Sequence, residues 1–243
     1  MAITTTDGDQ AQALLRLMQL VSPALPVGAF SYSEGLEALQ QAGGLGSAEA
    51  LRAWLQAELQ RGSVAIEAAA LSELMLLIAR LRTGEASAAA ALAERDGWLL
   101  AQREAAEVRA QQRQMGCSLL QLLNDLCGPL LPPGAPAGGA ELLPTLAWPA
   151  AYAWAGVCAQ LASPQLEQAY LYGWTANQIS AAVRLVPLGP TEGQRLQWQL
   201  APLIAARGEQ LAAAEPSTLW SGAVGAGLAQ LQHAELYSRL FRS

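Results

Sequence analysis

The chain has 243 residues, of which 52% are hydrophobic and 14% are charged, and its formal net charge is −6. It contains no lysine, which excludes a Walker-type phosphate-binding loop and Schiff-base chemistry. No basic cluster could follow a phosphate backbone, so we expect no nucleic acid partner.

The sequence also argues against a membrane span and a disulfide framework. Three prolines interrupt the uncharged stretch 142–166, which leaves fewer than the ~20 apolar residues that a span needs. The start of the chain lacks a basic segment followed by an apolar run, so we expect no signal peptide and a cytoplasmic location. Cys117, Cys127 and Cys158 are an odd, dispersed set, and we interpret them as small buried side chains in a reducing compartment.

Helical spacing of apolar residues dominates the first third of the chain. Helices are predicted, in chain order, over 10–20, 32–42, 47–61 and 64–81. The prolines and the glycine of 22–28 predict a rigid apolar loop after the first helix. Ser31 and Glu34 have the spacing of a capping box, so they are expected to start the second helix. Ser47 is expected to cap the third helix.

The rest of the chain continues in the same way. Further helices are predicted over 85–94, 97–126, 149–161, 163–185, 191–214 and 219–234. Asp96 is expected to cap the second of these, and we interpret its polar stretch 102–114 as a solvated face. No strand pattern occurs, so the predicted fold class is all-α. We expect a single domain (1–243) of about nine or ten helices, with a flexible N-terminus (1–9) and C-terminal tail (235–243).

Three stretches carry a resemblance to a known family. They are SPALPVGAFSYSEGLE at 22–37, RLVPLG at 184–189 and YSRLFRS at 237–243. In sequence and order they resemble signatures of the urease accessory protein F family, near both ends and in the middle of the chain. The resemblance implies a helical, non-catalytic protein without a cofactor that acts in assembly of the nickel centre of urease.

The resemblance also implies partners. Proteins of this family bind a second accessory protein, called D or H, and through that complex the GTPase accessory protein G. The assembly docks on urease apoprotein, and we expect a homodimer within it.

We predict that the loop after the first helix and the tail bind these partners. The predicted partner-binding residues are Phe30, Ser31, Tyr32, Glu34, Tyr237, Ser238, Arg239, Leu240, Phe241 and Arg242. We expect the segment 30–32 to lie at the surface, because the prolines and the glycine before it hold it there. The tail is expected to stay loose until it folds on a partner, with Arg239 next to Tyr32.

Two enzyme classes remain open as alternatives. A helical hydrolase would use Glu34 or His233, and a GTPase-activating protein would use Arg239 as an arginine finger. His233 is the only histidine, so it could hold a metal only if a second copy supplied ligands across a dimer interface. Because no catalytic set accompanies these residues, we predict no catalytic site and no metal site in the single chain.

Overall fold

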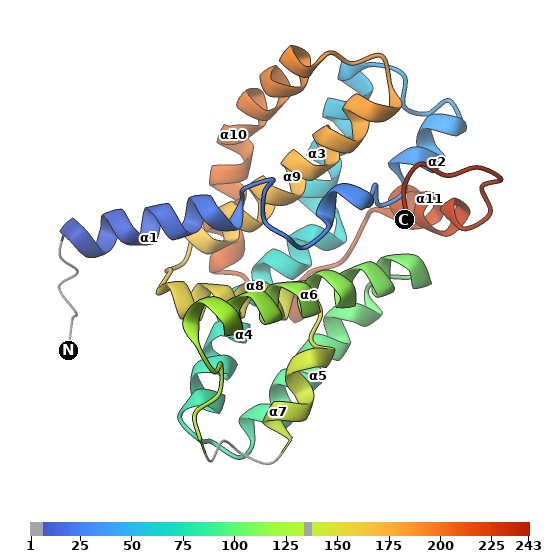
Figure 1. Cartoon of the computed structure of the whole chain (residues 1–243). Helices are drawn as coiled ribbons and strands as arrows, with labels where there is room; N and C mark the ends of the chain where they lie inside the picture. Colours follow the sequence, from blue (N-terminus) through green and yellow to red (C-terminus); the bar gives the residue numbers. More distant parts are fainter. Residues whose placement is uncertain (1–6, 134–137) are drawn as a thin grey trace.

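Helices α4 (Ser63–Arg82) and α8 (Trp148–Ala159) lie at the centre of the molecule, and the other helices pack around them (Figure 1). The computed structural model describes residues 7–133 and 138–243. α8 is buried on all sides because the segment 149–156 carries an apolar or small residue at every position. α4 is apolar along most of its length, so it contacts α3, α5, α8, α9 and α10.

Eight further helices surround this pair in the described part of the chain. They are α1 (Asp7–Leu20), α2 (Leu36–Gln41), α3 (Ala48–Arg61), α5 (Ala88–Ala101), α6 (Ala106–Cys127), α9 (Gln165–Leu185), α10 (Pro190–Ala212) and α11 (Val224–His233). A single turn, α7 (Gly139–Leu142), and 3₁₀ turns at Ala29–Ser31, Leu143–Thr145 and Pro216–Thr218 lie between them. No strand occurs among the described residues, which confirms the predicted all-α domain of about nine or ten helices.

Two long helices form one side of the molecule. α9 has 21 residues and α10 has 23, and they pack against each other along their length. α10 continues through Pro202, which lies inside it. Within the described ranges, no helix has both the length and the apolar character needed to cross a membrane. Of the predicted flexible segment 1–9, residues 1–6 lie outside the described residues, and 7–9 begin α1.

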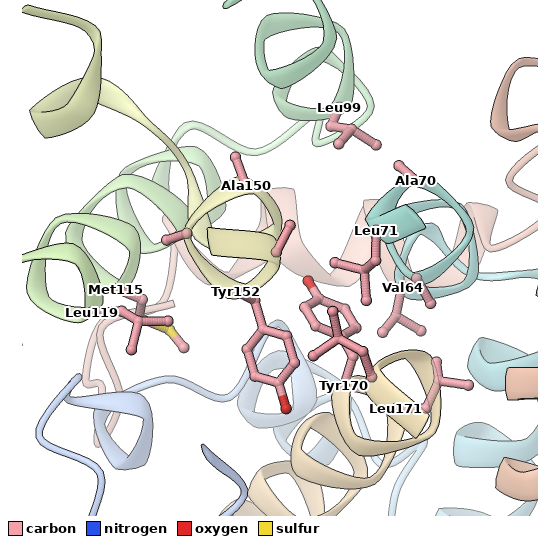
Figure 2. Packing of buried hydrophobic residues seen from close by; sticks show 14 of the residues in the cluster. Val64, Ala70, Leu71, Leu99, Met115, Leu119, Ala150, Tyr152, Tyr170 and Leu171 are labelled. Carbon is pink, nitrogen blue, oxygen red and sulfur yellow. The ribbon is translucent and has the colours of Figure 1, made fainter. Parts of the chain in front are cut away.

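Aromatic rings from α8 and α9 meet in the middle of the core (Figure 2). The rings of Tyr152 and Tyr170 lie edge to face with their centroids 5.1 Å apart, and Leu71 of α4 lies beside them. Such a ring pair stabilises the fold by about 1 kcal/mol beyond the burial of its surface. Burial raises the pKa of both tyrosine hydroxyls, so both remain protonated at neutral pH.

α6 and α8 pack unusually closely at one glycine. Gly116 lies on α6 where the backbone of Leu146 and Ala147 leads into α8. A Cβ atom at Gly116 would overlap the Leu146 carbonyl oxygen and lie 2.7 Å from the carbonyl carbon of Ala147. Only glycine therefore allows this approach, which fixes how the two helices lie against each other.

The structure corrects the predicted boundary between the fifth and sixth helices. α5 runs on through Gly97, where we predicted that Asp96 would cap a new helix. The Asp96 carboxylate instead accepts a hydrogen bond from the backbone N–H of Ala147 at 2.9 Å. Burial raises the pKa of Asp96 to about 6. A contact from a distant part of the chain, not the local cap signal, thus decides the place of this residue.

Candidate functional site

The three stretches that carry the family resemblance meet in space. Arg184, at the end of α9, donates from Nη1 to the Phe30 carbonyl oxygen at 2.9 Å. The same guanidinium lies 4.4 Å from the centre of the Phe241 ring. The backbone N–H of Arg242 donates to the Ser31 carbonyl oxygen at 2.9 Å. We call the contacts of residues 239–243 with the rest of the chain the tail clasp.

Glu37 is the main acceptor in the tail clasp. Its carboxylate accepts hydrogen bonds from the backbone N–H groups of Leu240 at 2.6 Å and Phe241 at 2.9 Å. Glu37 lies in the first turn of α2 and is buried. Hydrogen bonds to a charged acceptor are roughly twice as strong as those between neutral groups. One buried carboxylate thus holds two consecutive backbone groups of the tail.

His233 lies between two carboxylates at the end of α11. Its Nδ1 is 2.8 Å from Oε2 of Glu107, and its Nε2 is 3.3 Å from Oε2 of Glu37. Arg239 donates to the other oxygen of Glu107 at 2.5 Å. We expected Arg239 next to Tyr32, but the structure pairs it with Glu107 on α6. This arrangement links α2, α6, α11 and the tail through four polar side chains.

The His233 side chain has no exposed surface in the single chain. No group of three or more His, Cys, Asp or Glu residues that could hold a metal ion occurs in the described ranges. The geometry of His233 suits a structural role, in which the imidazole bridges Glu37 and Glu107.

The last residue of the chain is buried against polar groups of two other segments. Ser33 donates from its backbone N–H and from Oγ to the backbone oxygen of Ser243, at 2.8 Å and 2.7 Å. Oγ of Ser243 donates to Oε1 of Gln111 at 2.5 Å, and Gln111 donates in turn to Glu34 at 2.8 Å. Ser243 is only 1% exposed. Gln111 therefore connects the tail clasp with the interior of the protein.

Glu34 does not cap a helix, so the predicted capping box with Ser31 is wrong. α2 begins at Leu36, four residues later than predicted, because Glu34 and Gly35 both have positive φ, 50° and 89°. A Cβ atom at Gly35 would lie 2.9 Å from the backbone nitrogen of Gln230 on α11. The close packing of α11 therefore leaves no room for a side chain at position 35, where the turn before α2 has its positive φ.

The Glu34 carboxylate lies inside the protein, where it joins a second group of buried charges. Arg103 contacts Glu67 at 2.7 Å and Glu34 at 3.5 Å, and the Tyr170 hydroxyl donates to Glu67 at 2.8 Å. We call these four residues the Arg103 cluster. Burial opposes the charged form of the guanidinium, but the two carboxylates hold the pKa of Arg103 above its usual value.

The Arg103 cluster corrects the interpretation of the polar stretch 102–114 as a solvated face. Arg103, Gln111 and Gln112 are each 3% exposed, and they face carboxylates from α4 and from the loop before α2. One side of the stretch is therefore polar because it lies opposite buried charges, whereas Glu104, Arg113 and Gln114 face water as predicted.

Comparison with known proteins places the chain in a family. A model of the UreF family matches residues 45–201. A urease accessory protein UreF from Thermosynechococcus vestitus is 43% identical over 234 residues, which cover 95% of this chain and 98% of the relative. The chain belongs to the UreF family. The resemblance inferred from the three stretches is confirmed, although the first and last of them lie outside the range that the family model matches.

Two further UreF relatives cover nearly the whole chain. The urease accessory protein UreF of Alkalilimnicola ehrlichii is 39% identical over 239 residues, or 98% of this chain and 100% of the relative. That of a Synechocystis strain is 39% identical over 238 residues, or 95% of this chain and 98% of the relative. The similarity to UreF proteins therefore extends well beyond the range 45–201 that the family model matches.

The structure separates the predicted partner-binding residues of this UreF chain into exposed and buried sets. Phe30 is 69% exposed, Leu240 is 54% exposed and Tyr237 is fully exposed. Tyr32 and Phe241 are 6% and 4% exposed, so the expected surface position of Tyr32 is wrong. We expected a partner to cover the apolar tail residues, but the chain itself covers Phe241. Among the polar members, Ser238 accepts a hydrogen bond from Gln41 through its carbonyl oxygen at 3.2 Å.

Sequence reasoning missed three exposed apolar residues on α11. Val224, Leu228 and Leu231 are 79%, 54% and 46% exposed, on the helix that leads directly into the tail. Their spacing of four and three residues places them on one face of the helix. That spacing is visible in the sequence, but a buried face would produce the same pattern.

Proposed function

We propose that this UreF chain acts as a non-catalytic scaffold in maturation of the urease nickel centre. In this role it binds accessory protein D or H, recruits the GTPase accessory protein G and docks on urease apoprotein as a homodimer. The observation that carries the proposal is the tail clasp, because it presents large exposed apolar side chains on segments that it holds in place. The relatives named above are urease accessory proteins, which supports the same role.

The exposed residues are of the type that binds proteins. Phe30, Tyr237 and Leu240 extend from the segments that the clasp joins, and the exposed face of α11 lies shortly before Tyr237 and Leu240 in the sequence. Exposed aromatic and leucine side chains gain free energy when a partner covers them, and tyrosine is common among residues that dominate binding. Because the clasp already orders the backbone beneath them, binding there loses less conformational entropy than binding of a free tail.

The positions of the candidate catalytic residues favour a scaffold over an enzyme. Glu34 is bonded to Gln111 and Trp174, and His233 is fully buried between two carboxylates. Arg239 is partly exposed but paired with Glu107. A hydrolase needs such groups to converge on space that a substrate can enter, and here the Glu34 carboxylate and both ring nitrogens of His233 already have protein partners.

Co-purification tests the proposal directly. In this experiment the chain is given an affinity tag at its N-terminal end and is produced together with accessory proteins D and G and urease apoprotein. Replacing Tyr237 and Leu240 together by Ala is expected to weaken capture of protein D at least about tenfold, as for central interface residues. Trp198→Ala is the matched control, because Trp198 is 84% exposed on α10, away from the clasp.

Two results would contradict the proposal. One is a folded double variant that captures protein D and protein G as well as the wild type does. The other is equal loss of capture in the Trp198→Ala control. Sedimentation of the captured complex measures whether two copies of the chain are present. GTP hydrolysis by protein G with and without Arg239→Ala tests the GTPase-activating alternative separately.

A further inference from the structure

Two of the three cysteines lie across the contact between α6 and α8. Gly116 of α6 packs against Ala147 at the start of α8, and Cys127 and Cys158 each follow eleven residues later. Eleven residues make about three helical turns, so each cysteine returns to the face on which its helix makes this contact. The two helices run side by side in the same direction, which brings the two cysteines to the same level.

Both cysteines line one cavity of about 240 Å³ between α1, α6 and α8. Cys127 is exposed and Cys158 is partly buried, and both are free thiols. Burial raises the pKa of the Cys158 thiol to about 11, and the neighbouring Cys127 thiol contributes in the same direction through charge and a hydrogen bond. The pair thus combines an accessible thiol with a second, less accessible thiol that lines the same cavity. This contradicts our interpretation of the cysteines as buried hydrophobic side chains.

The surroundings of the pair disfavour a metal ion. Leucine and alanine side chains form most of the cavity wall, and Arg16 is its charged member. Arg82 also acts on Cys158, so two guanidinium groups lie near the thiols. Zinc and nickel sites need additional nitrogen, sulfur or carboxylate ligands, and positive charge nearby opposes a cation. A neutral disulfide needs no additional ligands, and positive charge nearby does not oppose it.

We propose that Cys127 and Cys158 form a reversible disulfide that ties the end of α6 to the end of α8. A small-molecule disulfide such as oxidised glutathione is the oxidant. The Cys127 thiolate attacks it, forms a mixed disulfide and releases one glutathione thiolate. The Cys158 thiolate then attacks the sulfur of Cys127, and the second glutathione leaves. Two protein thiols are oxidised, one glutathione disulfide is reduced to two thiols, and the two protons pass to the solvent or the leaving thiolates.

The order of the steps follows from accessibility. An incoming disulfide can reach exposed Cys127, whereas Cys158 lies deeper and is held mostly as the thiol. Cys158 therefore reacts second, when the mixed disulfide on Cys127 already lies in the same cavity. Cys117 lies on α6, ten residues and almost three turns before Cys127, and it does not line the cavity.

Thiol counting and peptide mapping test the proposal on the full chain. The reduced protein is treated with oxidised glutathione, its remaining thiols are alkylated, and its peptides are identified by mass spectrometry. We expect the number of free thiols to fall from three to one, with Cys117 left, and a linked peptide pair that contains Cys127 and Cys158. Dithiothreitol is expected to restore all three thiols. The matched control Cys117→Ser should form the same link.

The single variants separate this outcome from ordinary thiol oxidation. Cys158→Ser is expected to stop at a stable glutathione adduct on Cys127, and Cys127→Ser to lose the link. A stable glutathione adduct on Cys127 in the wild-type chain would overturn the proposal. So would a link that involves Cys117 or joins two chains.

Discussion

The Arg103 cluster and the tail clasp are both polar and buried, but they differ in what their charges hold. In the Arg103 cluster, charged side chains hold one another, and each is at most 7% exposed. In the clasp, the Glu37 carboxylate holds backbone N–H groups, and the outer members Glu107 and Arg239 remain 26% and 39% exposed. The first arrangement joins segments of the core, so we expect its loss to destabilise the whole fold. The second attaches the end of the chain, so we expect the tail to detach while the helices stay folded.

The largest expected effect of a substitution is in the Arg103 cluster. Arg103→Met leaves Glu34 and Glu67 buried without their positive partner, which typically lowers the free energy of unfolding by about 3–5 kcal/mol. Urea denaturation followed by circular dichroism measures the change. Arg195→Met is the matched control, because Arg195 makes only an exposed ion pair with Glu192 and should have little effect. Equal stability of the two variants would show that the cluster does not hold the helices together.

A second test uses pH, because Glu58 lies near the Arg103 cluster and is 6% exposed. Burial raises the pKa of Glu58 from 4.5 to about 7. Between these two values the folded protein holds a proton that the unfolded chain has released, so stability falls as pH rises through this window. Above about pH 7 the loss is complete, because the carboxylate is then ionised in both states.

Glu58→Gln should remove this contribution to the pH dependence. At pH 8 the variant is expected to be about 2 kcal/mol more stable than the wild type, and the advantage should disappear near pH 4.5. Urea denaturation of both proteins at several pH values from 4.5 to 8 measures this difference in the free energy of unfolding. Burial also raises the pKa of Asp96, so part of the loss of stability with rising pH remains in the variant. An advantage that is equally large at both ends of the range would contradict the assignment, and exposed Glu94→Gln is the control.

The smallest effect on global stability is expected in the clasp. Glu37→Gln weakens the hydrogen bonds from Leu240 and Phe241, so the amide hydrogens of both residues should exchange with solvent at least about tenfold faster. The unfolding midpoint should change much less, because the tail can detach alone. Glu49→Gln is the control, since Glu49 occupies the first turn of α3 but does not contact the tail. Unchanged exchange at Leu240 and Phe241 would show that Glu37 does not hold the tail.

Sequence reasoning succeeded where local signals decide the structure. Ser47 caps α3 as predicted and accepts from the backbone N–H of Ala50 at 3.1 Å. α4 begins and ends within one residue of its predicted limits, since its apolar run is long and glycines lie at both ends. The three family stretches also predicted the segments that form the candidate site.

It failed where a distant contact outweighs a local signal. Glu34 has the spacing of a capping residue, but its carboxylate bonds to Gln111 and Trp174, which are far away in sequence. Tyr32 was expected at the surface because the loop before it is rigid, yet rigidity does not determine which side chain faces inward. The buried position of Phe241 depends on Arg184 and α2, and no pattern within the tail indicates it.

The burial of Ser243 matters for how this chain can be joined to other sequences. Its oxygens form hydrogen bonds with Ser33 and Gln111, and the residue is buried. A fusion partner attached after Ser243 would force this residue out of its buried position. It would thereby disrupt the contacts of the tail clasp. A fusion partner attached before α1 would join the molecule at a helix that extends away from its body, remote from the clasp (Figure 1).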